Sequence, residues 1–281
     1  MTVAPPAPAA FVTGASAGLG RAITEKLLRE GFVVWGTARD RSRLQETFKD
    51  RAQFHPVVLD LQQAEAAVEV YRQARAETPA GFDLVVNNAG YGVFGGFVET
   101  PPEVWRRQLD AMLMTNLSLV HQQLADMTGR SRGTLVNVAS MATEFPLPYM
   151  TAYNVAKAGL SALSESLLIE TAGSEVTVID FRPGDFRTGF NQAMPSSPLL
   201  EPSGRSSPRQ LSAWRALERH LASAPGAERA ADDLWRAIHR GRGGVVRSGN
   251  WFQVTLAPLF ERLVPLAWAR AVRWRYFGLS S

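Results

Sequence analysis

Tyr153 and Lys157 lie four residues apart in the run Tyr-Asn-Val-Ala-Lys. In a helix, residues i and i+4 share one face, so a phenol and an ammonium group can be directed at the same bound molecule. The same spacing also arises by chance. The interpretation of the pair therefore depends on whether other segments provide a site for that molecule.

A glycine-rich segment near the start of the chain could provide this site. Residues 11–20 read Phe-Val-Thr-Gly-Ala-Ser-Ala-Gly-Leu-Gly, after an expected strand and at the start of an expected helix. Small residues let a backbone approach a pyrophosphate, whose charge is stabilised by exposed N–H groups and the helix dipole. The spacing is G-x-x-x-G-x-G and not the more common G-x-G-x-x-G. The segment indicates dinucleotide binding, although a glycine turn without a cofactor has the same composition.

Strand-like and helix-like segments alternate along the chain and would position these groups. A strand at residues 10–13, a helix at 18–30 and a strand at 32–37 open the pattern. Further strands are expected at residues 54–59, 84–86, 134–138, 176–181 and 245–247, with helices between most of them. Such alternation builds a parallel sheet with helices on both faces. The sequence therefore predicts an α/β fold, a doubly wound parallel sheet of the Rossmann type.

Two segments depart from this regular alternation. Residues 194–210 are rich in Pro, Ser and Gly and are expected to form a loop before a helix at about 211–222. The tail at residues 251–281 is apolar and aromatic but interrupted by prolines and arginines. We expect a single Rossmann domain over residues 1–250, with a lid region at about 186–223, followed by a C-terminal extension over 251–281.

Composition excludes several classes of function. The 281 residues are 46% hydrophobic and 20% charged, as in ordinary globular proteins. Without cysteine there are no disulfides or thiolate metal sites, and the four histidines form no cluster, so no metal is expected. The pI is 9.7, but the net charge is only +4 and acids separate the arginines, so nucleic-acid binding is not expected. No apolar run reaches the roughly 18 residues that span a bilayer. Residues 1–10 do not resemble a secretory signal, so we expect a cytoplasmic location.

Several motifs occur in the order and spacing of one family. The chain resembles the short-chain dehydrogenase/reductase family at residues 13–20, in the run Asn87-Asn-Ala-Gly90, and at Asn116, Ser140, Tyr153, Lys157 and Pro183-Gly184. The resemblance covers residues 10–190. It implies an NADP-dependent oxidoreductase acting on CH–OH and C=O groups, here a carbonyl reductase.

The resemblance implies a catalytic set of four residues, Asn116, Ser140, Tyr153 and Lys157. Tyr153 would be the general acid of ketone reduction, or the base of alcohol oxidation. A free phenol has a pKa near 10, which Lys157 and an oxidised nicotinamide would lower toward neutrality. Ser140 would donate a hydrogen bond to the substrate oxygen, and Asn116 would hold a water linking Lys157 to solvent. In purely structural roles, Asn116 would face solvent on a helix and Ser140 would cap a strand end.

The resemblance also implies the cofactor contacts, at Gly14, Ser16, Gly18, Leu19, Gly20, Arg39, Asp60, Leu61, Asn88, Ala89, Gly90, Tyr153, Lys157, Pro183, Gly184, Phe186 and Thr188. An acidic residue at the end of the second strand would bind the ribose hydroxyls of NAD and repel a 2′-phosphate. That position is Ala38; Arg39 follows it, with Arg41 and Arg43 close behind, which predicts NADP(H). Asp60 would contact the adenine amino group or cap the following helix.

The expected substrate pocket is apolar. Its walls come from the loops after the fourth, fifth and sixth strands, and the predicted lining residues are Phe94, Met141, Phe145, Tyr149 and Phe190. They favour a lipophilic ketone or alcohol, although each could instead pack the loops against the core.

Other interpretations stay open at this level. The chain could be a catalytically silent nicotinamide-sensing protein. It could also be a membrane-peripheral scaffold, or a keto-lipid or steroid dehydrogenase, whose Trp251, Trp268 and Trp274 lie among arginines on an anionic membrane surface. The tail could alternatively fold over the pocket or join subunits. A homodimer or homotetramer is expected, through helices near residues 103–127 and 151–171.

Overall fold

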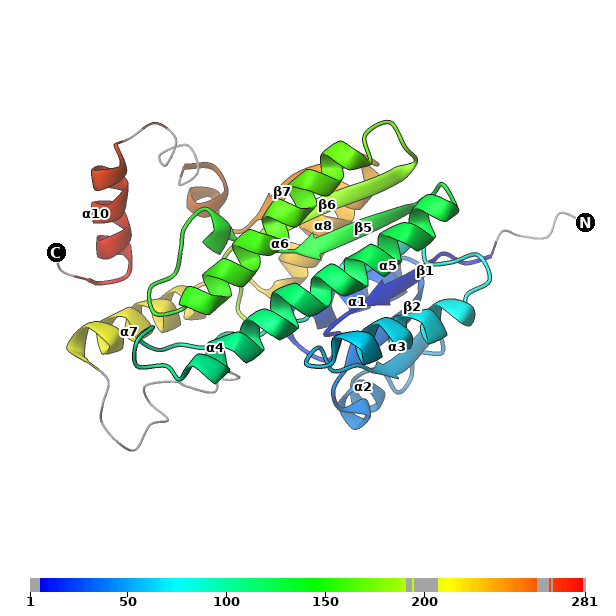
Figure 1. Ribbon diagram of the computed structural model, residues 1–281, viewed down its shortest axis with the longest axis horizontal. Helices are drawn as coiled ribbons and strands as arrows, with labels where there is room; N and C mark the ends of the chain where they lie inside the picture. Colours follow the sequence, from blue (N-terminus) through cyan, green and yellow to red (C-terminus); the bar gives the residue numbers. More distant parts are fainter. Residues whose placement is uncertain (1–5, 191–193, 195–206, 257–262, 264, 280–281) are drawn as a thin grey trace, which may run out of the picture.

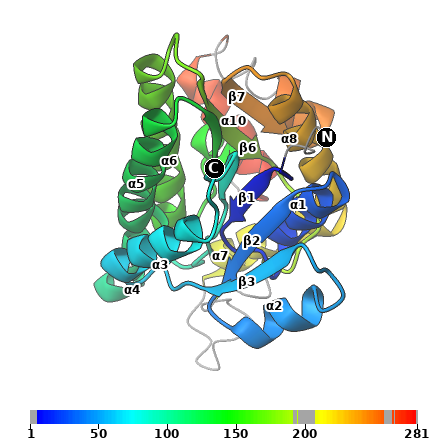
Figure 2. The same ribbon diagram turned by 90° about the vertical axis from the view of Figure 1, so that its right-hand side faces the viewer.

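A parallel sheet forms the centre of the molecule (Figures 1 and 2). The computed structural model describes residues 6–190, 194, 207–256, 263 and 265–279. Within them the sheet has seven strands in the order β3-β2-β1-β4-β5-β6-β7. The strands are β1 (Ala9–Val12), β2 (Val33–Ala38), β3 (Phe54–Val58), β4 (Leu84–Asn87), β5 (Gly133–Val138), β6 (Val176–Pro183) and β7 (Gly244–Ser248). The predicted doubly wound Rossmann sheet is confirmed.

Helices cover both faces of the sheet (Figure 2). One face carries α1 (Gly18–Arg29) and α8 (Ala227–His239), while α3 (Ala64–Ala76), α5 (Thr115–Gly129) and α6 (Thr151–Glu170) cover the other. Successive strand residues alternate between the two cores: Val12 packs with the first set and Phe11 with the second. Because both faces are buried, β1 and β4 contain no exposed position. Short α2 (Arg41–Thr47) follows β2.

The long helix expected near residues 103–127 is interrupted. It consists of α4 (Pro102–Leu109), a π-helical turn η1 (Asp110–Met114) and then α5. Asn116 Nδ2 donates hydrogen bonds to the carbonyls of Met112 at 3.0 Å and Ala111 at 3.3 Å. The side chain thus pairs with the backbone of the widened turn, a local effect that hydrophobic periodicity does not reveal.

The C-terminal elements gather beyond the carboxyl ends of the strands (Figure 1). Helix α7 (Pro208–Ala222) begins with a capping box between Ser207 and Gln210. After β7 come the π-helical η3 (Phe252–Leu256) and α10 (Leu266–Tyr276). Ser212 on α7 donates a hydrogen bond to the carbonyl of Gly278 at 2.7 Å, so the chain after α10 is attached to α7.

Part of the lid region predicted at about 186–223 falls outside this description, because residues 191–193 and 195–206 are not among the described ones. Over the described part of the chain, no helix combines the length and the apolar character that crossing a bilayer requires.

Candidate active site

A cavity of about 1000 Å³ opens at the carboxyl ends of the strands. It lies where the strand order reverses, since the chain passes from β1 to β2 on one side and from β4 to β5 on the other. Open α/β sheets bind ligands at such a switch point.

The glycine loop between β1 and α1 forms one wall. Gly14 and Gly18 have φ angles of +71° and +53°, which residues other than glycine rarely adopt. A Cβ at Gly20 would lie 2.1 Å from the Gly14 carbonyl oxygen, so only glycine allows this turn to close. The loop is fixed to β4, because Thr13 Oγ1 accepts hydrogen bonds from the N–H groups of Asn88 at 2.9 Å and Ala89 at 3.0 Å. This glycine-rich backbone at a helix N-terminus fits the pyrophosphate of a dinucleotide.

Every residue predicted to contact the cofactor lines this one cavity. The lining includes Gly14, Ser16, Gly18, Leu19, Gly20, Arg39, Asp60, Leu61, Asn88, Ala89, Gly90, Tyr153, Lys157, Pro183, Gly184, Phe186 and Thr188. Asp60 also accepts a hydrogen bond from the Gln62 backbone N–H at 3.0 Å, so it stabilises the turn before α3 as well.

Positive charge surrounds the end of β2. Ala38, Arg39 and Arg43 all line the cavity. The nearby acid, Asp40, lies at the start of α2: its Oδ1 accepts hydrogen bonds from the Ser42 hydroxyl at 2.7 Å and the Ser42 N–H at 2.8 Å, and its Oδ2 lies 4.0 Å from Arg43 Nε. These bonds lower the pKa of Asp40 and cap α2. The site at the end of β2 therefore offers guanidinium groups to a ligand.

Tyr153, Lys157 and Ser140 meet in the same cavity. Tyr153 and Lys157 share one face of α6, and the Lys157 Nζ lies 5.9 Å from the centroid of the Tyr153 ring. Nζ also donates a hydrogen bond to the Val138 carbonyl at 2.6 Å. Ser140 Oγ accepts the Ala142 N–H at 3.0 Å, and its hydroxyl also interacts with the Tyr153 phenol. Ser140 therefore caps the turn that follows it and also lines the cavity.

Burial dominates the ionisation of Tyr153. It raises the pKa of the phenol, the Ser140 hydroxyl partly offsets this rise, and the charge of Asp185 adds to it. The predicted lowering of this pKa by Lys157 together with an oxidised nicotinamide stays a prediction. Among the protein's own groups, desolvation of the phenolate outweighs the favourable interactions. The phenol therefore holds its proton at neutral pH and can donate it.

Burial also lowers the pKa of Lys157 from 10.5 to about 8, and the charge of Asp180 opposes the change. Because the folded pKa lies below the unfolded one, the burial cost is fully present below pH 8. It disappears as the pH rises from about 8 toward 10.5. A shift of this size corresponds to about 3 kcal/mol.

Replacing Lys157 by methionine should therefore stabilise the fold at neutral pH. With about 1 kcal/mol deducted for the lost hydrogen bond to Val138, we expect Lys157→Met to raise the free energy of unfolding by about 2 kcal/mol at pH 7. The gain should shrink as the pH approaches 10.5, the ordinary value for lysine. Urea unfolding followed by tryptophan fluorescence at several pH values measures it.

Lys49 provides the matched control, since it is exposed at the end of the α2 region. Lys49→Met should leave the free energy of unfolding nearly unchanged at every pH. If the difference in free energy of unfolding between wild type and Lys157→Met does not change with pH, burial of the Lys157 ammonium does not destabilise the fold.

Asn116 does not line the cavity. It is 3% exposed, which makes the solvent-facing interpretation wrong, and its amide binds the turn η1. Its predicted role in holding a water beside Lys157 stays a prediction.

The predicted substrate residues divide into two groups. Met141, Phe145 and Phe190 line the cavity, and the Phe190 ring packs edge-on against Tyr153 with 5.7 Å between centroids. Phe94 and Tyr149 are not among the lining residues. The Phe94 ring lies 5.0 Å from Trp214 and 5.6 Å from Tyr149, so both form part of the apolar cluster beneath α7.

Sequence reasoning missed a polar group on the cavity wall, formed by Asp185, His220, Gln253 and Tyr276. Asp185 directly follows the Pro183-Gly184 motif, so its position was a usable signal. The other three come from α7, η3 and α10, where no motif marks them. The tail thus contributes to the cavity wall, as one of its alternative interpretations anticipated.

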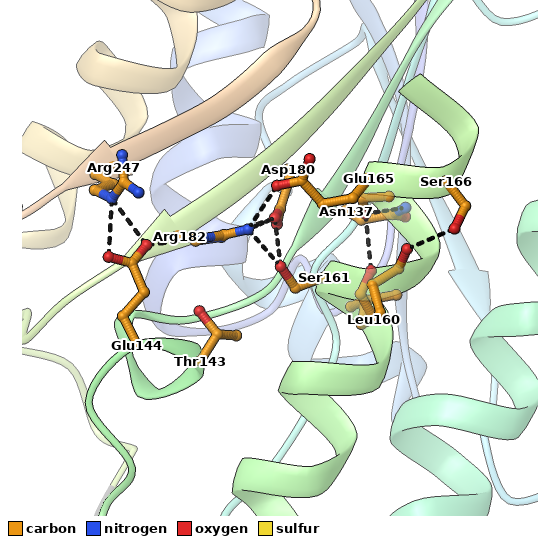
Figure 3. Close-up of polar contacts among 12 residues, drawn as sticks. Asn137, Thr143, Glu144, Leu160, Ser161, Glu165, Ser166, Asp180, Arg182 and Arg247 are labelled. Carbon is orange, nitrogen blue, oxygen red and sulfur yellow. Dashed lines mark hydrogen bonds and ion pairs between the residues drawn. The ribbon is translucent and has the colours of Figure 1, made fainter. Parts of the chain in front are cut away.

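A buried ionic network supports the loop that follows Ser140 (Figure 3). Arg182 on β6 donates to Asp180 at 2.8 Å, to Glu144 at 2.8 Å and to Ser161 of α6 at 2.7 Å. Glu144 also accepts from Arg247 of β7 at 2.8 Å. Glu144 follows the short 3₁₀ turn η2 (Met141–Thr143), so the network joins the Ser140 loop to α6, β6 and β7.

The fold and the cavity together define a nucleotide-binding α/β oxidoreductase. The family model for short chain dehydrogenases matches residues 8–198. The chain therefore belongs to the short-chain dehydrogenase family, whose members are oxidoreductases that use a nicotinamide cofactor in carbonyl and alcohol chemistry.

Individual proteins agree with this assignment. An uncharacterised oxidoreductase of Myxococcus xanthus is 38% identical over 180 residues, covering 62% of this chain and 70% of that protein. A 3-ketodihydrosphingosine reductase of Bacteroides thetaiotaomicron is 27% identical, covering 64% of each chain. A Burkholderia phymatum short-chain dehydrogenase/reductase solved with NAD is similar with a TM-score of 0.78 and 26% identity, covering 92% of both chains.

Proposed function

We propose that this oxidoreductase reduces the carbonyl group of a lipophilic ketone with NADPH, and that Tyr153 donates the proton. One observation carries the proposal: the phenol of Tyr153, the Ser140 hydroxyl and the glycine loop all line one cavity. A reduced nicotinamide bound in this cavity would supply hydride to the carbonyl carbon.

The residues of the chain have separate roles in this proposal. The Ser140 hydroxyl and the Tyr153 phenol both donate hydrogen bonds to the carbonyl oxygen, which orients it and stabilises the negative charge that develops there. Tyr153 then transfers its proton to that oxygen. Lys157, buried on the same face of α6, supplies positive charge that stabilises the resulting phenolate.

The preference for NADP over NAD rests on the end of β2. Arg39 and Arg43 would form charge-assisted hydrogen bonds with a 2′-phosphate, and Ala38 offers it no repulsion. The lipophilic character of the substrate rests on Met141, Phe145 and Phe190 in the cavity wall.

A ketone panel tests the proposal. Aliphatic, aryl and acyl-chain ketones are incubated with the purified chain and NADPH, and with NADH in parallel, while nicotinamide absorbance is followed. Consumption of NADPH with an apolar ketone, at a higher kcat/KM than with NADH, is the expected result. NADPH binding without turnover of any ketone would favour a nicotinamide-sensing protein instead.

A further inference from the structure

The cavity wall beside the proposed proton donor contains a carboxylate for which the described part of the chain provides no lysine or arginine partner. Asp185 is half-buried and lines the cavity together with Tyr153. Among the described residues, no lysine or arginine forms an ion pair with it, and His220 is the only positively ionisable group that affects its pKa. Burial raises the pKa of Asp185, and it lowers the pKa of His220, which is therefore mostly neutral at pH 7.

The neighbours of Asp185 hold it in place without neutralising it. Gln253 Nε2 donates to Asp185 Oδ2 at 2.5 Å, and the Tyr276 hydroxyl donates to the same oxygen at 3.3 Å. Gln253 Oε1 accepts the Asp185 backbone N–H at 3.3 Å, so the amide contacts the residue at two points. Both hydrogen bonds to the carboxylate end on Oδ2, and Oδ1 has no hydrogen-bond partner among the described residues.

A partly desolvated carboxylate on a cavity wall attracts a hydrogen-bond donor, above all a cation. Aromatic rings surround this position: the His220 and Tyr276 rings lie 4.1 Å apart, and Phe277 also lines the cavity. Such rings favour a cation that is attached to an apolar body.

We propose that Asp185 binds a protonated amino group of the substrate, so that the preferred substrates are lipophilic amino ketones. This inference rests on the proposed carbonyl reduction and narrows its substrate class. A bound ammonium would also offset the charge of Asp185, which otherwise raises the pKa of Tyr153, and would make the phenol a stronger acid.

Two isosteric ketones test the inference. β-Aminopropiophenone and butyrophenone differ by an ammonium in place of a methyl group, and each is assayed at pH 7 with saturating NADPH. Wild type should prefer the amino ketone in kcat/KM by roughly tenfold or more, the usual effect of one charge-assisted hydrogen bond. Asp185→Asn, which keeps the size and an acceptor oxygen, should abolish that preference. Because the substitution also removes a charge that raises the pKa of Tyr153, butyrophenone reduction should be maintained or increased.

Glu170→Gln is the matched control, because it removes an exposed carboxylate at the end of α6. It should retain the preference for the amino ketone. Thermal unfolding and NADPH fluorescence titration establish that Asp185→Asn folds and binds the cofactor as wild type does. The assignment would be overturned if Asp185→Asn lost activity toward both ketones equally or changed only the KM for NADPH. It would also be overturned if wild type showed no preference between the two ketones.

Calorimetric binding of the two ketones separates this inference from the proposed function. If neither ketone is reduced, the proposed function fails. Selective binding of the amino ketone that Asp185→Asn abolishes would still support the amine site, whereas equal binding of the two ketones would refute it.

Discussion

Tyr153→Phe should lower kcat/KM for ketone reduction by roughly a thousandfold or more, the range expected when a general acid is lost. The substitution removes one oxygen and keeps the ring that packs against Phe190 and below Lys157. NADPH binding, followed by fluorescence titration, should stay close to wild type because the glycine loop and β2 are untouched. Steady-state rates with one ketone from the panel give the measurement.

Tyr149→Phe is the matched control, since Tyr149 does not line the cavity among the described residues and packs against Phe94. It should retain nearly full activity. Turnover by Tyr153→Phe within a few-fold of wild type would mean that another group supplies the proton.

Ala38→Asp should reverse the proposed preference for NADPH. A carboxylate at the end of β2 would repel a 2′-phosphate beside Arg39 and would accept hydrogen bonds from the ribose hydroxyls of NADH. We expect the ratio of kcat/KM values for NADPH over NADH to fall by about a hundredfold, which corresponds to about 3 kcal/mol. Parallel kinetics with the two coenzymes measure it.

Ala38→Asn has nearly the same volume as the aspartate variant and lacks its charge. It should therefore change the ratio far less than Ala38→Asp does. If both variants reduce the ratio equally, crowding at the end of β2, and not electrostatic repulsion, controls the choice of coenzyme.

The sequence predicted those parts of the site that local spacing specifies. Tyr153 and Lys157 share a helix face because of their spacing in the sequence. The glycine turn has positive φ angles at its own glycines. Both features could therefore be recognised without tertiary information. The sheet followed from alternating strand and helix patterns, and its strands lie close to the expected ranges.

Other features depend on contacts between distant segments. Asp185 is held by Gln253 and Tyr276, which are 68 and 91 residues away in sequence. The polar wall of the cavity is therefore created by packing of the tail, and no local pattern encodes it. Likewise, Phe94 and Phe190 were both predicted to line the pocket, but Phe94 packs against Trp214 of α7 in the core and only Phe190 lines the cavity.

The network centred on Arg182 links the proposed proton donor's helix to the strand edge and to the loop after Ser140 (Figure 3). The elements that carry the two hydroxyl groups are thus joined to each other by buried hydrogen bonds and ion pairs. Heating should consequently leave the geometry for turnover intact until the whole fold melts. Residual activity after brief incubation at each temperature should then track the calorimetric transition, with no earlier inactivation step.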